Sequence, residues 1–235
     1  MALYKFANLT VELKNRYKYT ELLCKEFLCS DQVEADIIVS VDKDDIEMQK
    51  ALSPNCDTGY IESVCFLRSL AQELHIYEAM LMHASVIDYC GKGIAFLAAS
   101  GVGKTTHTQL WKASFGEKVC IINGDKPIIR FEDDVPYAYG TPWAGKEGFY
   151  TNDKTPLVAV CFIEQSYTNG INPLNAQEVI GLLAKQIFIP SHPISAIKIL
   201  ELMDRLTKSV NFFKICCNME KSAAIIALEG MREIL

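Results

Sequence analysis

The feature that most constrains the fold is a short glycine-rich turn between an expected buried strand and an expected helix. Residues 94–98 form an apolar run typical of a buried strand. Residues 105–115 have the pattern of a helix, and Gly116 supplies the glycine that commonly follows a helix end. The turn between them, Ser100-Gly101-Val102-Gly103-Lys104, lets successive N–H groups point inward beside a helix N-terminus. This order predicts an α/β domain whose turn binds an anion.

Residues 98–105 fit the phosphate-loop pattern, except that Ala98 replaces the first glycine. Lys104 can reach the outer phosphates of a nucleotide, and the Thr105 hydroxyl is a ligand of the kind that Mg²⁺ prefers. The sequence therefore predicts a nucleotide and Mg²⁺ as cofactors; we take the nucleotide as ATP and leave a preference between ATP and GTP open. The expected nucleotide-binding residues are Ser100, Gly101, Val102, Gly103, Lys104, Thr105 and Thr106.

A carboxylate follows the next apolar strand, which is expected over residues 119–122. Asp125 lies just after the end of this strand. Together with Thr105, it is expected to hold the Mg²⁺ ion. Strand character resumes over residues 127–131, which leaves no room for a crossover helix. We therefore expect a mixed or largely antiparallel sheet in which Asp125 occupies a bend.

The rest of the chain divides into two expected parts. Residues 1–80 are expected to form an N-terminal α/β lobe, and residues 81–235 a nucleotide-binding kinase core with C-terminal helices. In the lobe, the patterns predict strands over residues 4–14 and 35–41, and helices over residues 19–28, 46–52 and 60–82. In the core, further strands are expected over residues 84–89, 135–139, 157–164 and 212–217, and helices over residues 175–189, 195–210 and 220–235. The fold class is thus α/β, a mixed-sheet phosphate-loop core with a small lobe and a helical tail.

Charge and hydropathy exclude several classes of protein. Lys and Arg number 23 against 29 Asp and Glu, a net charge of −6, which argues against nucleic acid or an anionic membrane as the partner. The longest apolar run, near residues 94–99, is far shorter than the roughly 20 residues of a membrane helix. Residues 1–10 lack a signal-peptide pattern. We expect a soluble, cytoplasmic protein with reduced cysteines.

Three segments together resemble a known family. His83-Ala84-Ser85-Val86-Ile87-Asp88 with Gly93, the loop of residues 100–106, and Asn123-Gly124-Asp125 resemble the C-terminal catalytic domain of HPr serine kinase/phosphorylase. More distantly, they resemble ATP-dependent phosphoenolpyruvate carboxykinase, and the resemblance covers about residues 80–165. It implies that Lys104 and Thr105 bind nucleotide phosphates and magnesium. It also implies that Asp125 lies beside the metal and the accepting hydroxyl, with His83 near the transferred phosphate.

Other residues have a functional and a structural interpretation. In the loop Gly140–Gly148, Trp143 and Gly145 could bind the substrate and Lys146 could neutralise the transferred group, or the Trp could cover the core and the Lys be solvated. Arg130 could contact a phosphate or pair with a nearby carboxylate. His83 could be catalytic or held by backbone hydrogen bonds.

The phosphate-loop pattern and the resemblance together imply a phosphotransferase of the HPr serine kinase type. The expected reaction moves the γ-phosphate of ATP to a hydroxyl, most simply Ser or Thr of a peptide or small protein, with Asp125, His83 and Lys146 as catalytic residues. Two alternatives stay open: a kinase for a free small molecule, and a nucleotide sensor without turnover. The acceptor and the oligomeric state stay open too, a homo-oligomer included.

Overall fold

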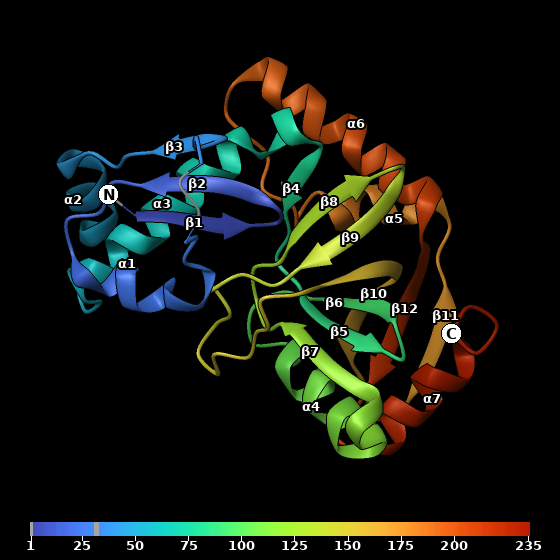
Figure 1. Cartoon of the computed structure of the whole chain (residues 1–235). Coiled ribbons are helices and arrows are strands. Elements are labelled where there is room, and N and C mark those ends of the chain that lie inside the picture. The colour runs from blue at the N-terminus through green and yellow to red at the C-terminus, as the bar shows by residue number, and fades with distance from the viewer. Residues whose placement is uncertain (1, 31–32) are drawn as a thin grey trace.

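A computed structural model describes residues 2–30 and 33–235. The N-terminal part forms a separate three-stranded sheet of order β1-β2-β3, covered by helices, at one end of the molecule (Figure 1). Its elements are β1 (Ala2–Phe6), β2 (Leu9–Leu13), α1 (Lys18–Leu23), β3 (Ile37–Val39), α2 (Lys43–Leu52) and α3 (Thr58–Glu73).

The strand expected over residues 4–14 is wrong, because the chain turns back at Ala7 and Asn8. Both residues have positive φ, 50° and 60°, which is the geometry of a two-residue hairpin turn whose twist matches the flanking strands. The turn is held from outside the lobe: Asn8 Nδ2 donates to Tyr139 Oη at 2.9 Å. Only Asn8 of the pair carries a local turn signal, so the sequence pattern missed the hairpin.

The helix expected over residues 60–82 ends early. Asp57 begins α3 as its N-cap, accepting from Gly59 N at 2.8 Å. The helix stops at Glu73, a 3₁₀ turn follows at Leu74–Tyr77, and Ala79–Leu81 forms strand β4. All three residues of β4 are buried, and a short, fully buried run has the same pattern in a strand and in a helix.

The second sheet is mixed, as expected, and contains nine strands within the described residues. Its main path runs β4-β8-β9-β10-β6-β5-β7, and β12 adds to β10. The long strand β10 pairs in parallel with β6 and β12, and antiparallel with β9 near its start. Strand β11 was not expected. The strands are β4 (Ala79–Leu81), β5 (Ser85–Tyr89), β6 (Lys92–Leu97), β7 (Val119–Asn123), β8 (Ile128–Glu132), β9 (Val135–Tyr139), β10 (Lys154–Gln165), β11 (Gly170–Pro173) and β12 (Asn211–Cys217).

Helices cover both faces of this sheet. Alternate residues of β6 point to opposite faces: Phe96 packs with α4 (Lys104–Phe115) and α7 (Ser222–Gly230), whereas Leu97 packs with α5 (Ala176–Leu183) and α6 (Pro193–Ser209). Figure 1 shows α4 and α7 together on one side and α5 and α6 on the other. Asn175 and Glu178 form the expected capping box at the start of α5.

Within the described part of the chain, no helix combines the length and the apolar character that a membrane crossing requires. All nine cysteines are free thiols.

Candidate functional site

The predicted phosphate loop lies where β6 ends and α4 begins. Leu97, the last residue of β6, is paired with Phe162 of β10 in the sheet register. Helix α4 starts seven residues later, at Lys104. Gly101 and Gly103 have φ values of +81° and +121°, a region that other residues rarely adopt. The structure therefore places a strand, a glycine-dependent turn and a helix in the order that phosphate binding requires.

The remaining residues of the loop surround this turn. Val102 is anchored from β10, because Gln165 Nε2 donates to its carbonyl oxygen at 3.0 Å. The exposed members are Ser100 and Gly101, and the half-buried members are Val102, Gly103, Thr105 and Thr106.

Lys104 is folded back into the loop. Its side chain is buried, and Nζ donates to the carbonyl oxygen of Ala98 at 2.8 Å. Burial lowers the pKa of Lys104, the nearby Asp125 carboxylate raises it, and Lys126 lowers it, with a net value below the usual 10.5. Hydrogen bonds place the two ends of the candidate site near each other: Thr108 Oγ1 of α4 bonds both Lys104 O and Ser85 Oγ at 3.0 Å, and Ala84 N, next to Ser85, donates to Asp125 O at 3.1 Å.

Asp125 is the centre of a small charged cluster. Its Oδ1 lies 3.1 Å from His83 Nε2, and its Oδ2 lies 3.2 Å from Lys126 Nζ. Burial raises the pKa of Asp125, but the hydrogen bond from His83 and the charge of Lys126 outweigh burial, so that the pKa lies below 3.8. Asp125 is thus an ionised carboxylate at neutral pH, with about 30% of its side chain exposed.

Asn123 shapes the bend that presents Asp125. Its buried side chain accepts from Asp125 N at 2.9 Å and Lys126 N at 2.7 Å, while its Nδ2 donates to Thr141 O at 2.9 Å. The bend is also tied to the start of β5, since Ala84 N donates to Asp125 O at 3.1 Å. The sequence patterns did not indicate that Asn123 orders this bend or that Lys126 pairs with Asp125. An Asn before Gly at a strand end is the turn signal that could have indicated Asn123.

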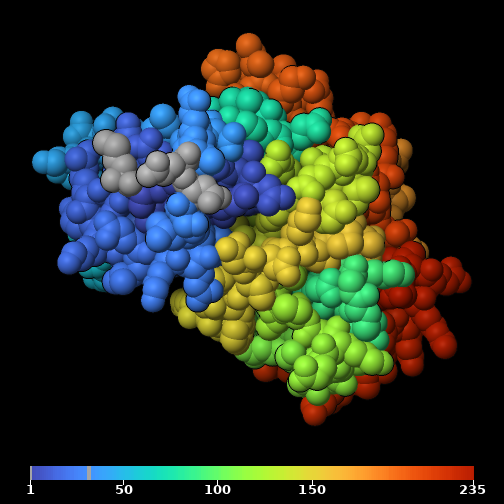
Figure 2. Space-filling view, viewed as in Figure 1, coloured from blue at the N-terminus to red at the C-terminus, as the bar shows by residue number. Residues whose placement is uncertain are grey.

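The loop of residues 140–148 packs against the same bend. Gly145 has φ +79°, and a Cβ added there would lie 3.2 Å from Asp125 Cβ. Lys126 N donates to Trp143 O at 3.1 Å. Lys146 is exposed on this loop. In Figure 2 the yellow segment near residue 150 lies on the surface between the blue N-terminal lobe and the green segments.

The side chain of Trp143 points away from this site. It is 7% exposed, its Nε1 donates to Ser63 O of α3 at 3.0 Å, and its ring lies 5.4 Å from that of Phe6. This corrects the prediction that Trp143 presents its ring to a substrate. Its apolar ring fills the core of the lobe, which was the structural alternative.

Arg130 also has a structural partner. Its Nη1 donates to Ala7 O at 2.7 Å, which fixes the β1–β2 turn against β8. This corrects the prediction that Arg130 contacts a phosphate: the half-buried guanidinium satisfies a backbone carbonyl of the lobe.

His107 lies buried on α4, one turn beyond the predicted phosphate loop. Its Nε2 accepts from Trp111 Nε1 at 3.1 Å, and its Nδ1 has no partner among the described residues. Burial lowers the pKa of His107 to about 4. His107 is therefore neutral in the folded protein at physiological pH.

We expect this histidine to make the fold sensitive to acid. Below pH 6.5 the unfolded chain binds a proton that the folded chain excludes, so stability falls with pH until about pH 4. The free energy of unfolding should drop by about 2 kcal/mol between pH 7.5 and pH 5 from this group alone. Urea unfolding measured across this range should show a smaller drop in His107→Gln. Equal slopes for the parent and the variant would contradict this origin.

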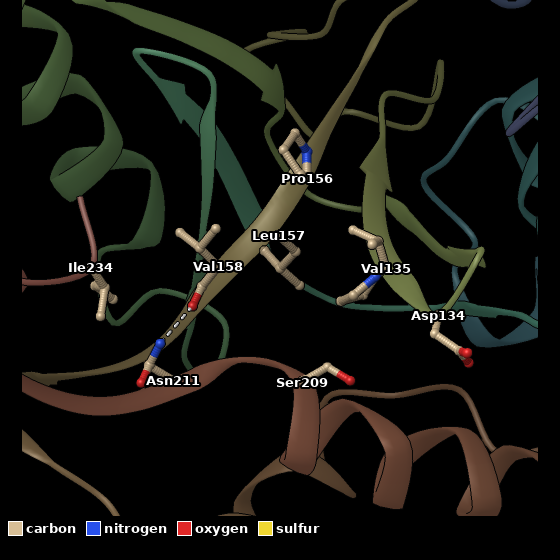
Figure 3. A pocket seen from close by; sticks show the side chains of 9 residues that line it. Asp134, Val135, Pro156, Leu157, Val158, Ser209, Asn211 and Ile234 are labelled. Atoms are coloured by element: carbon tan, nitrogen blue, oxygen red, sulfur yellow. Dashed lines mark hydrogen bonds between the residues drawn. The ribbon is translucent and has the colours of Figure 1, made fainter.

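A cavity of about 540 Å³ lies at the other end of β10 (Figure 3). There Asn211 Nδ2 donates to Val158 O at 3.4 Å, whereas the predicted phosphate loop contacts Gln165 at the end of the strand. Only one of its lining residues, Asp134, is ionisable, so this cavity does not resemble a catalytic site. It is lined by Asp134, Val135, Pro136, Pro156, Leu157, Val158, Ser209, Asn211 and Ile234.

Comparison with known proteins leaves the family of the chain open. No family model matches the chain, and no curated protein matches it. It is similar to the solved structure of the HPr(Ser) kinase/phosphatase from Coxiella burnetii, with a TM-score of 0.38 and 7% sequence identity over 65% of this chain and 97% of that one.

Proposed function

We propose that the chain is an ATP- and Mg²⁺-dependent kinase that transfers the γ-phosphate to a hydroxyl group of a peptide or small protein. The observation that carries this proposal is the Asp125–His83 pair, 3.1 Å apart, which hydrogen bonds through Ala84 and Ser85 connect to the start of α4 at Lys104, directly after a glycine-dependent turn. Phosphate binding and a carboxylate next to the phosphate are the two parts that phosphoryl transfer requires.

In this proposal each residue has a defined role. The loop amides and Lys104 hold the phosphates, and Lys104 exchanges its bond with Ala98 O for a phosphate oxygen. The acceptor oxygen forms a bond to the γ-phosphorus while the bond from that phosphorus to the β,γ-bridging oxygen breaks, which releases ADP. Asp125 orients the acceptor hydroxyl and receives its proton. Because its pKa is low, Asp125 is a weak base, which suits a loose transition state where positioning and charge matter most.

His83 is a positioning residue for this carboxylate. Its hydrogen bond to Oδ1 fixes the orientation of Asp125, and its own backbone is fixed because His83 N donates to Gln186 O at 2.7 Å. Lys146 is proposed to approach the transferred phosphate from the exposed loop and to neutralise its charge.

The donor atoms at the site fit Mg²⁺. The Thr105 hydroxyl and the Asp125 carboxylate are hard oxygen ligands, and Mg²⁺ bound to a nucleotide keeps several water and phosphate ligands. In residues 2–30 and 33–235 there is no cluster of three or more His, Cys, Asp or Glu side chains that could hold a metal without the nucleotide. When bound, the ion would neutralise charge on the phosphates.

The acceptor is proposed to be a peptide because the site lies at the surface. Asp125 and His83 each keep about 30% of the side chain exposed, and the neighbouring Gly145–Gly148 segment is exposed. A small-molecule kinase stays the alternative within the same chemistry. A sensor without turnover is the second candidate, and one observation favours it: both oxygens of Asp125 already have partners, His83 and Lys126.

Lys104→Ala tests nucleotide binding. The variant loses one charged contact to phosphate, which is worth about 1.5–3 kcal/mol, so ATP affinity should fall roughly tenfold or more. Titration calorimetry with Mg²⁺ and ATP measures this change. Lys208→Ala, which removes an exposed lysine paired with Asp204, is the matched control and should bind ATP like the parent. Equal ATP affinity in Lys104→Ala and the parent would overturn the proposal.

A further inference from the structure

Two exposed apolar side chains lie just beyond the ends of β10 and β12. Tyr167 is fully exposed, at 101%, and Met219 is 79% exposed. Large apolar side chains in loops, presented by a rigid sheet, are commonly used for binding. Neither residue has a role in the site described above.

Both side chains lie in segments that adjoin the phosphate loop. Tyr167 is two residues after Gln165, whose side chain donates to Val102 O of the phosphate loop at 3.0 Å. The segment with Met219 is tied to that of Tyr167, because Ser166 N donates to Cys217 O at 3.0 Å and Asn218 Nδ2 donates to Tyr167 O at 3.4 Å. Since β6, β10 and β12 are parallel, their carboxyl ends lie at one edge of the sheet.

The position of Asp125 gives the bound nucleotide a direction. Across the sheet the strands follow the order β12-β10-β6-β5-β7, with the phosphate loop after β6 in the middle (Figure 1). Asp125 follows β7, on one side of the loop, so the transferred phosphate belongs on that side. The other end of the nucleotide must then lie on the opposite side of the loop, over the ends of β10 and β12.

We propose that Tyr167, with Met219 on the adjoining segment, is the stacking platform for the nucleobase, an inference that rests on the proposed function. Aromatic side chains stack on any base because every base has a π-face. The nearby side-chain amide of Asn169 has hydrogen-bond partners at both ends and does not need a base to satisfy it. Its Oδ1 accepts from Asn218 N at 2.8 Å and its Nδ2 donates to Ser222 Oγ at 3.0 Å. Stacking without hydrogen-bond readout should hold adenine and guanine alike.

The experiment compares three probes by titration calorimetry with Mg²⁺: ATP, GTP and inorganic tripolyphosphate. Tyr167→Ala removes the ring from a fully exposed position, so folding is unaffected. It should weaken both ATP and GTP by roughly 5- to 150-fold, the range for loss of one base–aromatic stack, and leave tripolyphosphate unchanged. Tyr60→Ala, at an exposed tyrosine of α3, is the matched control and should bind all three probes like the parent.

Tyr167→Trp supplies a direct signal, because the two native tryptophans, Trp111 and Trp143, are buried. ATP should quench its fluorescence and tripolyphosphate should not. Unchanged ATP and GTP affinity in Tyr167→Ala would overturn the base platform, and so would a loss for one purine alone or an equal loss for tripolyphosphate. If the parent binds neither ATP nor tripolyphosphate, the proposed function is overturned, and the base platform with it.

Discussion

Replacing Asp125 by Asn should slow ATP turnover by a factor of roughly 10²–10⁴, the usual contribution of a positioned acid or base. The amide keeps the size of the carboxylate and can still accept the hydrogen bond from His83, but it cannot receive a proton or offset the charge of Lys126. A group that matters more in the transition state than in the ground state changes turnover more than binding. ATP affinity should therefore fall much less than the rate.

Single-turnover consumption of ATP, with and without a mixture of serine- and threonine-containing peptides, measures this effect. Asp134→Asn makes the same change at an exposed carboxylate paired with Arg205 and should keep the parent rate. Equal, substantial rates in Asp125→Asn and the parent would remove Asp125 from the mechanism. A parent that binds ATP and consumes none would identify the chain as a sensor.

Trp143→Ala should lower the free energy of unfolding by about 3–5 kcal/mol, the usual cost of truncating a buried tryptophan. The variant leaves a cavity beside Phe6 and removes the hydrogen bond to Ser63 O in the core of the lobe. The effect on stability is expected to be larger than any effect on ATP binding, because the ring does not face the phosphate loop.

Urea unfolding followed by circular dichroism measures this loss, and Trp143→Phe should recover much of it by refilling the cavity. Met48→Ala truncates an exposed side chain of α2 and leaves no cavity. This control variant should keep nearly the stability of the parent. Parent-like stability in Trp143→Ala, combined with slower transfer to the acceptor, would restore the substrate-binding interpretation.

The mixed sheet could be predicted because its signals are local. Each of three patterns determines the structure of residues close to it in the sequence. They are the apolar strand at 94–98, the two loop glycines, and the absence of a crossover helix after Asp125. They predict a turn into a helix and, directly after the bend, another strand in antiparallel pairing. The structure has both, at α4 and at β8, which pairs antiparallel with β4 and β9. The expected catalytic and nucleotide-binding roles of the loop residues, His83, Asp125 and Lys146 stay predictions.

The errors arose where distant contacts decide local structure. Ala7 adopts a turn conformation while Arg130, 123 positions away, binds its carbonyl oxygen. Trp143 is in a glycine-rich loop, which predicts exposure, yet its ring packs in the core of the lobe and its Nε1 donates to Ser63 O of α3. A pattern of nearby residues carries no information about such partners.

Trp143 also joins two regions that the chain order separates. Its ring belongs to the core of the N-terminal lobe, while its carbonyl oxygen accepts from Lys126 N beside the Asp125 carboxylate. One residue thus connects the core of the lobe to the backbone of the Asp125 bend, and we expect the positions of the two to be coupled. With such coupling, a ligand that binds one position of the bend more tightly also stabilises the matching position of the lobe, and by reciprocity a ligand that binds the lobe in that position raises affinity at the bend by the same factor.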